Sequence, residues 1–381
     1  MGTIRVAHRA GDRLREIARF RSAGSAEGFH RVPLGNGKST IVEHPGAQAP
    51  KSAIGSHLKS PRGTMSIGHT EIHVKGKPAR VPSAQIDGRT VLATGNWLKM
   101  AAVQDEELTE GETVANPEAF VSQLKESGLN ADIFTFAQKL PETTPKYSYH
   151  HEWDNLAIIP ITTFSDWWEK RVESSVRRAV KRAAKLGVVA KVVEFDDAFV
   201  NGIVGINNET PIRQGRAFWH FQKSFEEVKR ENSTYPGRNA FLGAYYEDEL
   251  IGFMRIIYAD RMASTVQLLS KMKHYDKRPA NAMIAKAVEL CEKEGISYLM
   301  YCNYVYNDPN SSLTEFKRRN GFEQVLLPRY YIPLSLKGKI ALQLGLHRGL
   351  VQRIPKPILS RLLKIRSSWY ERRMKADGEA A

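Results

Sequence analysis

Cysteine is scarce in this sequence, which holds only Cys291 and Cys302. Two thiols cannot build a disulfide framework or a zinc site made of cysteines, so neither of these supports the fold. Proteins of oxidising compartments are often held together by disulfides, whereas a reducing compartment keeps thiols free. We therefore expect a cytoplasmic protein.

Long apolar runs are also missing. No stretch approaches the roughly 18 consecutive apolar residues that a membrane-spanning helix needs. The first residues, up to Phe20, contain several arginines and lack the apolar core of a secretory signal. We expect neither a transmembrane segment nor such a signal. Hydrophobic residues make up 42% and charged residues 25% of the chain, the balance of an ordinary globular protein.

The net charge of +15 is confined to the two ends of the chain. Residues 1–65 carry 11 Lys/Arg against 4 Asp/Glu, and residues 336–375 carry 11 against 1. Residues 66–335 are neutral, with 34 of each sign. A dedicated nucleic-acid enzyme needs a basic channel through its body, which this neutral centre argues against. The basic C-terminal stretch still allows peripheral contact with RNA or an anionic membrane, or it packs its apolar stripe on the body.

Composition and hydrophobic pattern divide the chain into five segments. Residues 1–65, rich in Gly, Ser, Pro, Ala and Arg, are expected to be disordered or to precede a true start at Met65. The remaining segments are expected as a small α/β unit over 66–164, a basic linking helix over 165–187, a larger domain over 188–334 and a basic amphipathic helical tail over 335–381.

In the smaller unit, short strands come first. A turn at Asp87-Gly88 joins two of them. Asn116 caps a helix that begins at Pro117 and ends before Gly128. The strands are expected at 71–74, 81–86, 90–94, 131–138 and 154–161.

The larger domain shows the order β-α-α-β-β-β-α-β-α-β-β. Its strands are expected at 188–195, 239–246, 250–259, 264–272, 297–304, 322–328 and 329–334. Its helices are expected at 196–209, 221–230, 281–294 and 313–319, the last with a capping box formed by Ser312 and Glu315.

This order resembles the GNAT acyltransferase fold, which implies an α+β architecture with a mixed, mostly antiparallel sheet flanked by helices. In that family the loop after the fourth strand has the form Q/R-x-x-G-x-G/A, and its amides bind the pyrophosphate of coenzyme A. The corresponding residues here are KRPANA at 277–282, and a later family signature appears as FKRRNGF at 316–322. Both glycines of the loop are replaced by alanine, and Pro279 removes one donor.

The resemblance implies acetyl-CoA or another acyl-CoA as donor, an amine as acceptor and no metal. A helix N-terminus binds phosphate readily, which supports the loop assignment independently of the family. The residues expected to bind the cofactor are Gln267, Leu269 and Ser270 on the strand, and Lys277, Arg278, Ala280, Asn281 and Ala282 at the helix start.

The general acid of many GNAT enzymes is a tyrosine where this chain has Lys317. A lysine protonates a leaving thiolate only if burial lowers its pKa from about 10.4. We expect Lys317 to be a surface cation instead. Tyr301, Tyr304 and Tyr306, at the end of the fifth strand, are then the candidate acids, the alternative being that they pack on the sheet.

A crowded polar loop follows the first helix of the domain, in the region that covers the acceptor site in the family. Glu209 is the candidate base for an ammonium acceptor. Arg213 and Arg216 are candidates to hold a carboxylate or phosphate in bidentate fashion. Asn208 and His220 complete the expected acceptor site. The alternative is a capped loop with an internal Glu–Arg pair.

The stretch from Asp154 to Glu194, with its basic helix RRAVKRAAKLGV, is similar to Fem-type proteins, in which such a helix links two GNAT-like halves. That likeness implies a partial GNAT-like unit over 66–164 and, as a second donor, aminoacyl-tRNA. A third possibility is a GNAT-shaped binding module without turnover. His150, Glu152 and Asp154 would share one face of a strand, but no fourth ligand is apparent, so no metal site is expected.

Overall fold

The computed structural model describes residues 67–74, 77–213, 216–306 and 309–348. The strands within them are β1 (Gly68–Val74), β2 (Lys77–Ile86), β3 (Arg89–Thr94), β4 (Met100–Val103), β5 (Ile133–Ala137), β6 (His150–Pro160), β7 (Val189–Val193), β8 (Ile212–Arg213), β9 (Arg216–Ala217), β10 (Asn239–Tyr246), β11 (Glu249–Ala259), β12 (Met262–Ser270), β13 (Tyr298–Asn303) and β14 (Glu323–Pro333). The helices are α2 (Pro117–Glu126), α3 (Phe164–Asp166), α4 (Ser174–Lys185), α5 (Asp197–Asn207), α6 (Phe225–Asn232), α7 (Pro279–Lys293), α8 (Ser312–Arg319) and α9 (Leu336–Gln343). Short helical turns are η1 (Glu106–Leu108), η2 (Trp167–Arg171), η3 (Met272–Lys277) and η4 (Leu346–Arg348).

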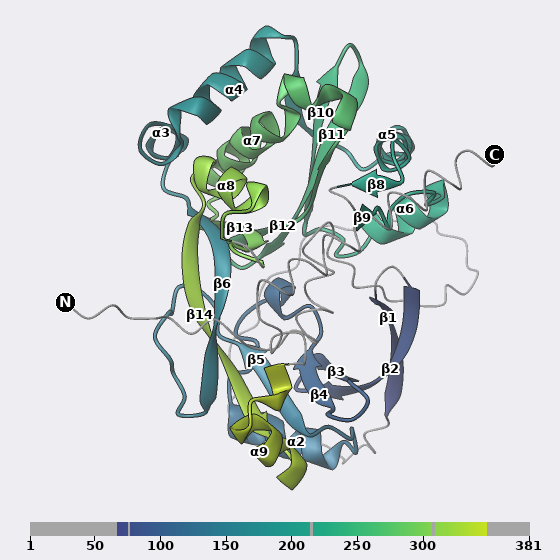
Figure 1. The fold of residues 1–381 in the computed structure, drawn as a ribbon, viewed down its shortest axis with the longest axis vertical. Coiled ribbons are helices and arrows are strands. Elements are labelled where there is room, and N and C mark those ends of the chain that lie inside the picture. The colour runs from purple at the N-terminus through teal and green to yellow at the C-terminus, as the bar shows by residue number, and fades with distance from the viewer. Residues whose placement is uncertain (1–66, 75–76, 214–215, 307–308, 349–381) are drawn as a thin grey trace, which may run out of the picture.

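Twelve of the strands form one sheet, in the order β1-β2-β3-β4-β5-β14-β6-β13-β12-β11-β10-β7, and β8 and β9 form a separate hairpin. Among the paired strands of this sheet, β4–β5 and β12–β13 are parallel and the others antiparallel. The fold is therefore mixed α/β with a large, mostly antiparallel sheet flanked by helices, as the sequence predicted (Figure 1).

Two long strands join the halves of this sheet. β6 pairs with β13 of the larger half, and β14 pairs with β5 of the smaller half, while β6 and β14 pair with each other. Read outward from this central pair, each half begins with an antiparallel pair (β14–β5 or β6–β13), continues with one parallel pair and ends with antiparallel pairs. The boundary expected near residue 164 stays a prediction, because β6 and β14 each contact strands of both halves.

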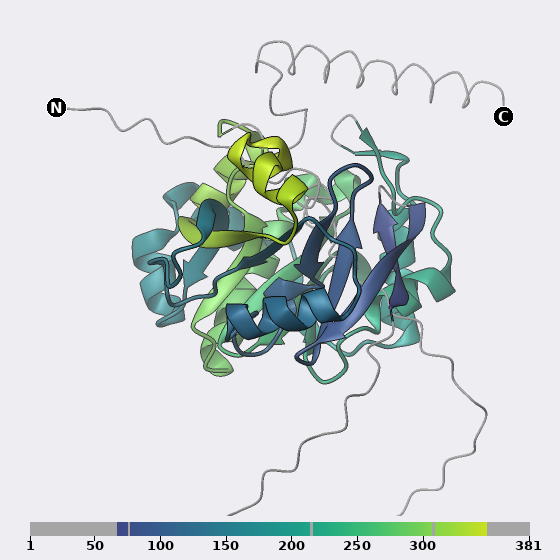
Figure 2. The same cartoon turned by 90° about the horizontal axis from the view of Figure 1, so that it is seen from below.

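The smaller half follows the sequence closely. Asp87 and Gly88 have positive φ values of 48° and 69°, which the tight turn between β2 and β3 requires. Asn116 accepts a hydrogen bond from the amide of Ala119, so α2 begins where its cap was expected. α2 lies against the strands of the smaller half (Figure 2), and its Phe120 belongs to one buried cluster with residues of those strands.

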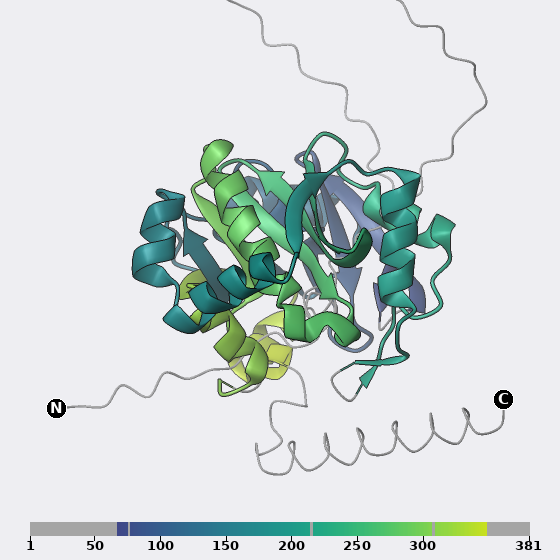
Figure 3. The same cartoon turned by 90° about the horizontal axis from the view of Figure 1, so that it is seen from above.

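In the larger half, helices cover both faces of the sheet. α7 and α4 pack on one face through a buried cluster that contains Ala287 and Val176. α5 and α6 lie on the opposite face (Figure 3), where Phe199 and Val228 belong to one buried cluster with Phe253 of β11. Over residues 189–333 the elements follow the order expected for a GNAT-like domain, except that the hairpin β8–β9 lies between α5 and α6 and a single strand, β14, ends the series.

Three local predictions were wrong. The expected single helix over 165–186 is broken at Val172, whose ψ of 132° is extended. The guanidinium of Arg177 stabilises this break by donating to the carbonyls of Trp168 and Val172. The expected strands 322–328 and 329–334 are one strand, because pairing with β6 continues past Pro328. The cap of α8 is Ser311, which accepts from the amide of Thr314.

The expected disorder of residues 1–65 lies outside the described residues, as does most of the expected tail. The part of the tail that is described begins with a helix, α9, whose Ala341 packs beneath Tyr331 of β14. Among the described residues, no helix is both long and apolar enough to cross a membrane.

Candidate active site

A wedge opens between β12 and β13. The two strands pair only from Met262 to Ser264 with Tyr298 to Met300, and then diverge. Beyond this point β12 keeps β11 on one edge, with a register shift at which Val266 is the additional residue. The described residues contain no strand that pairs with the other edge. Its backbone amides are therefore free to serve an external acceptor.

Polar atoms without partners accumulate along the same strand. Four buried side-chain atoms of β12 make no hydrogen bond to any described residue, and they are Ser264 Oγ, Thr265 Oγ1, Gln267 Oε1 and Ser270 Oγ. Leaving a buried polar group unpaired costs roughly 1–3 kcal/mol. A concentration of such atoms at or beyond the point of divergence is what a binding site for a polar ligand provides.

Lys317 of α8 places its side chain against the end of β13. The sequence predicted a surface cation, but the residue is buried. The residue is 0% exposed. Its ammonium donates to the carbonyl oxygen of Asn303 over 2.5 Å and lies 4.6 Å and 4.7 Å from the ring centroids of Tyr301 and Tyr306. Burial lowers the pKa of Lys317 to about 8. A lysine with that pKa exchanges its proton near neutral pH, as a catalytic acid must.

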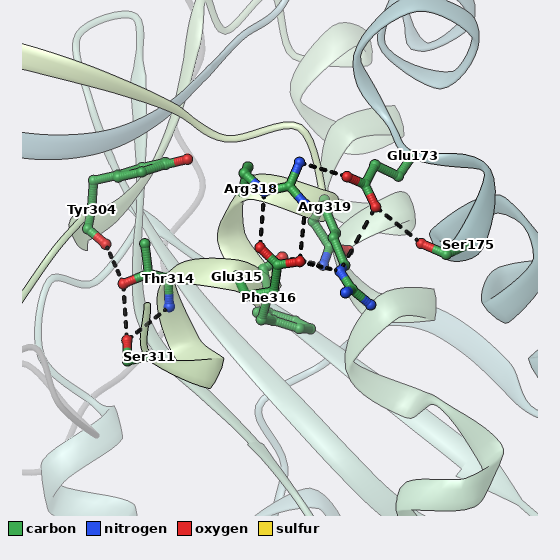
Figure 4. Close-up of polar contacts among 10 residues, drawn as sticks. Glu173, Ser175, Tyr304, Ser311, Thr314, Glu315, Phe316, Arg318 and Arg319 are labelled. Atoms are coloured by element: carbon green, nitrogen blue, oxygen red, sulfur yellow. Dashed lines mark hydrogen bonds and ion pairs between the residues drawn. The ribbon is translucent and has the colours of Figure 1, made fainter. Parts of the chain in front are cut away.

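The opposite face of α8 holds Lys317 in place. Glu315 pairs with Arg318 and Arg319 on the exposed side, and both arginines reach Glu173 at the start of α4 (Figure 4). At the other end of α8, the hydroxyl of Thr314 donates to the carbonyl of Tyr304. The helix is therefore fixed between the break before α4 and the strand end that Lys317 contacts.

Of the tyrosines expected as acids, Tyr301 and Tyr306 lie beside this lysine. Tyr306 forms one of the two aromatic faces over the ammonium. Tyr304 packs against the core cluster, and burial raises its pKa. Raising the pKa of a phenol makes it a weaker acid, so Lys317 is the better proton donor near neutral pH.

The carboxylate of Glu209, the candidate base, makes hydrogen bonds within the protein. Its carboxylate accepts from the amides of Met272 and Lys273, at 2.6 Å and 2.9 Å, where the chain leaves β12. It also pairs with Arg213 at 3.3 Å. These two amides lie between β12 and residues 277–282, the segment that the resemblance assigns to the pyrophosphate, and the chain's own carboxylate occupies them.

Neighbouring cations of the same loop are also neutralised internally. Glu249 pairs with Lys271, Lys273 and His274, and the hydrogen bond from Lys271 is the main cause that lowers the pKa of Glu249 to about 2. Lys277 lies over the ring of Tyr246. These basic side chains are thus already in contact with other side chains of the protein.

The start of α7 is less occupied. Its N-cap, Arg278, has a positive φ of 58° and contributes no side-chain cap. The first-turn amides of Ala280 and Asn281 are therefore open to an acceptor from outside the helix. The side chain of Asn281 donates to that of Asn320, and Ala282 is buried. The helix dipole favours an anion at this position.

The other residues expected at the acceptor site are dispersed. Arg213 donates to the carbonyls of Ser270 and Ile206 and joins Glu209, whereas Asn208 accepts from the amide of Gln222. Leu269 packs in the cluster of Phe253, and His220 is buried against Trp219. The backbone of Arg216 is in β9, but its side chain lies outside the described residues.

A cavity of about 570 Å³ lies between the two halves. Leu108, which lines it, packs against Val266 at the register shift of β12. The cavity wall includes Arg89, Arg230, Arg238 and the buried Gln104, both of whose side-chain amide atoms lack partners. The wall thus offers guanidinium groups and an unsatisfied amide close to the strand that borders the wedge.

One signal in the sequence marked Lys317. Leu313, Phe316, Lys317 and Asn320 are spaced i, i+3, i+4 and i+7, so they share one face of α8. The lysine therefore stands where the pattern requires a buried residue. Glu209 carried no such signal, because its amide partners are more than 60 residues away.

Comparison with known proteins finds similar chains among solved structures alone. No protein-family model matches the sequence, and no curated protein sequence matches it. Among solved structures, FemX is 10% identical with a TM-score of 0.47, the match covering 73% of this chain and 90% of FemX. The C-terminal (DUF2156) domain of a putative lysylphosphatidylglycerol synthetase from Agrobacterium fabrum is 13% identical with a TM-score of 0.45, covering 69% and 86%.

A smaller protein matches part of the chain. The PaiA N-acetyltransferase of Thermoplasma acidophilum, solved with coenzyme A, is 18% identical with a TM-score of 0.29, the match covering 38% of this chain and 99% of that protein. The resemblance to GNAT and Fem-type proteins concerns the fold. At these identities it assigns no donor, acceptor or activity.

Proposed function

We propose that this chain is an acyltransferase that moves an acyl group onto an amine in the wedge between β12 and β13. The observation that carries the proposal is the buried ammonium of Lys317 at the mouth of a strand pair that diverges after three residue pairs. A buried lysine costs stability, and functional sites are where such costs are retained.

The chemistry needs few side chains. A neutral amine attacks the acyl carbon, and the oxyanion that forms accepts hydrogen bonds from the open edge of β12. The bond to the leaving group then breaks, and Lys317 donates its proton to the departing atom. The proton that the amine loses on forming the amide returns to the neutral lysine, so the enzyme ends in its initial protonation state.

The donor that fits best is an oxygen ester of the aminoacyl-tRNA type. Glu209 occupies the amides of Met272 and Lys273, so these two donors are not available to a diphosphate while the carboxylate stays in place. An alkoxide is a poorer leaving group than a thiolate, so an ester donor benefits more from an acid such as Lys317. The surplus of Lys and Arg over residues 336–375 would contact the polyanionic part of such a donor.

Acyl-CoA is the second candidate donor, favoured by one specific observation. The uncapped first turn of α7, with the amides of Ala280 and Asn281, is a ready anion site beside the wedge. These amides belong to residues 277–282, the segment in which the resemblance places the pyrophosphate.

The acceptor, in this proposal, is an amine that also carries a carboxylate or phosphate. The cavity beside Leu108 supports this, because Arg89, Arg230 and Arg238 line it. We further propose a cytoplasmic location, in line with Cys291 and Cys302 forming no disulfide with each other.

Binding and single-turnover measurements on the full chain test the donor. We expect a pool of charged tRNA to bind at physiological salt and to be deacylated faster by wild type than by Lys317→Met when an amine is supplied. Calorimetry with acetyl-CoA distinguishes the second candidate. If neither donor binds, the chain is a binding module and the transferase proposal is wrong.

A further inference from the structure

Three potential metal ligands converge at the start of β6. His150 and Glu152, two residues apart, lie on one face of the strand, and His347 of η4 approaches them from the C-terminal segment. One ligand atom from each of the three lies within 4.8 Å of the others. His347 Nε2 is 3.1 Å, and His150 Nε2 is 3.8 Å, from Glu152 Oε1.

This group differs from the one that the sequence indicated. Asp154, the expected third member, instead accepts a hydrogen bond from Arg329 at 2.6 Å. The residue that takes its place, His347, follows Glu152 by 195 positions. Sequence spacing alone could not have shown it.

Unsatisfied atoms point to a ligand that the protein itself does not supply. Glu152 Oε2 and His347 Nδ1 are buried and make no hydrogen bond to any described residue. Glu152 is 8% and His347 4% exposed. Each therefore retains a lone pair or donor that burial makes costly to leave unpaired.

The charges around the group must be counted as well. Arg348 Nε donates to Glu152 Oε1 at 2.8 Å and would oppose a cation there. Its side chain is 38% exposed, so it can withdraw into solvent, or the cation can take the unpaired Oε2. The rings of Tyr331 and His347, 5.0 Å apart, shield the site on the side of β14.

We propose that His150, Glu152 and His347 bind a divalent transition metal of the zinc type. Two imidazoles and one carboxylate are ligands that zinc accepts, with a fourth position left for water. Tetrahedral ligands at bond lengths of about 2.0–2.1 Å lie roughly 3.3 Å apart, close to the separations of 3.1 Å and 3.8 Å in the structure. His150 is half-exposed, so the fourth position faces solvent.

The metal would hold η4 against β6. β6 is central to the sheet, and η4 is the last described element before residues 349–381. A metal that joins His347 to His150 and Glu152 ties the end of this element to the strand that both halves share. Because binding requires the folded arrangement, the metal stabilises the chain by mass action.

The test is metal binding by the full chain after treatment with a chelator. Zinc binding is measured by calorimetric titration. Cobalt binding is measured by visible absorption, because the spectrum of bound cobalt shows whether the site is tetrahedral. Wild type is expected to bind one equivalent of zinc with a Kd of about 1 μM or below and to melt at a higher temperature with zinc. His347→Gln and His150→Gln should each weaken binding by at least about tenfold.

His151→Gln is the matched control. His151 is adjacent on the same strand but packs on Trp153 and Tyr330, away from the group, so its loss should leave zinc affinity unchanged. Arg348→Met should tighten binding, because it removes the competing cation. Absence of zinc binding by wild type, or affinity unaltered in both His150→Gln and His347→Gln, would show that the group is only an ion pair. His150→Gln keeps the test valid if His347→Gln fails to fold.

Discussion

Lys317 and Asn303 are joined by a buried hydrogen bond, in which the ammonium donates to the backbone carbonyl over 2.5 Å. The lysine also lies over two tyrosine rings. Helix α8 therefore fixes the end of β13 through a cation, where a packed apolar side chain would serve stability better. Among the described residues, this buried ammonium is the feature that most strongly indicates a functional site.

The first prediction concerns stability and pH. Burial lowers the pKa of Lys317 from 10.5 to about 8, so between these values the unfolded chain binds more protons than the folded one. The free energy of unfolding contributed by this group must then rise with pH, from about 8 to about 10.5. The full effect is on the order of 3 kcal/mol, since one pKa unit corresponds to about 1.36 kcal/mol.

Lys317→Met isolates this contribution. Denaturant unfolding at several pH values should show wild type gaining stability relative to the variant as the pH rises through that window. Other titrating groups are common to both proteins and cancel in the difference. Parallel pH curves for the two proteins would mean that the ammonium is hydrated and not the acid proposed.

The second prediction concerns turnover. If protonated Lys317 donates to the leaving group, kcat/KM should fall as the pH rises above about 8. Lys317→Arg retains the charge but not a proton that can be given up near neutral pH, so we expect a rate at least about 100-fold lower, at the low end for general acid catalysis. Donor binding should change much less. If Lys317→Arg instead shows the pH profile of wild type, the lysine stabilises charge and does not donate a proton.

What the sequence could predict was local. Asn116 before Pro117 and the turn at Asp87-Gly88 are caps and turns whose partners lie within a few residues, and the structure has them as expected. The pairing of β14 with β5 and β6 could not be predicted in the same way. It joins segments almost 200 residues apart, and nothing in either segment specifies its partner.

The candidate site shows the same division. The amphipathic spacing of α8 placed Lys317 on the buried face, yet residue type alone favoured a surface cation. For Glu209, the crowded polar loop predicted a functional carboxylate, whereas the structure gives it backbone amides of a distant loop. Contacts between loops depend on how the strands pair in the sheet, and the local sequence pattern does not specify that pairing.

The third prediction uses this loop. Glu209→Ala frees the amides of Met272 and Lys273, and we expect it to lower the free energy of unfolding by about 1–2 kcal/mol, because both amides remain near solvent. If the carboxylate blocks a diphosphate position, the same variant should bind coenzyme A at least about tenfold more tightly than wild type in calorimetry. Glu209→Gln, which still accepts hydrogen bonds, is the control and should lie between. If Glu209→Ala binds coenzyme A more weakly than wild type, the carboxylate does not block the site but holds its backbone in the binding conformation.

The fourth prediction concerns the junction of the halves. Arg329 of β14 is paired with Glu106 of η1 and Asp154 of β6, and all three side chains are largely buried. Arg329→Met leaves two carboxylates without their cation in a poorly hydrated place, so we expect a loss of roughly 3–5 kcal/mol in denaturant unfolding.

The variant that removes all three charges separates charge from packing. Glu106→Gln and Asp154→Asn, combined with Arg329→Met, should recover much of that loss, since replacing a whole buried ion network is often nearly neutral. A double-mutant cycle between Asp154 and Arg329 gives the coupling directly. If Arg329→Met alone costs under about 1 kcal/mol, water reaches the group and the strand pair is held by its ladder and its aromatic packing, with little contribution from the ions.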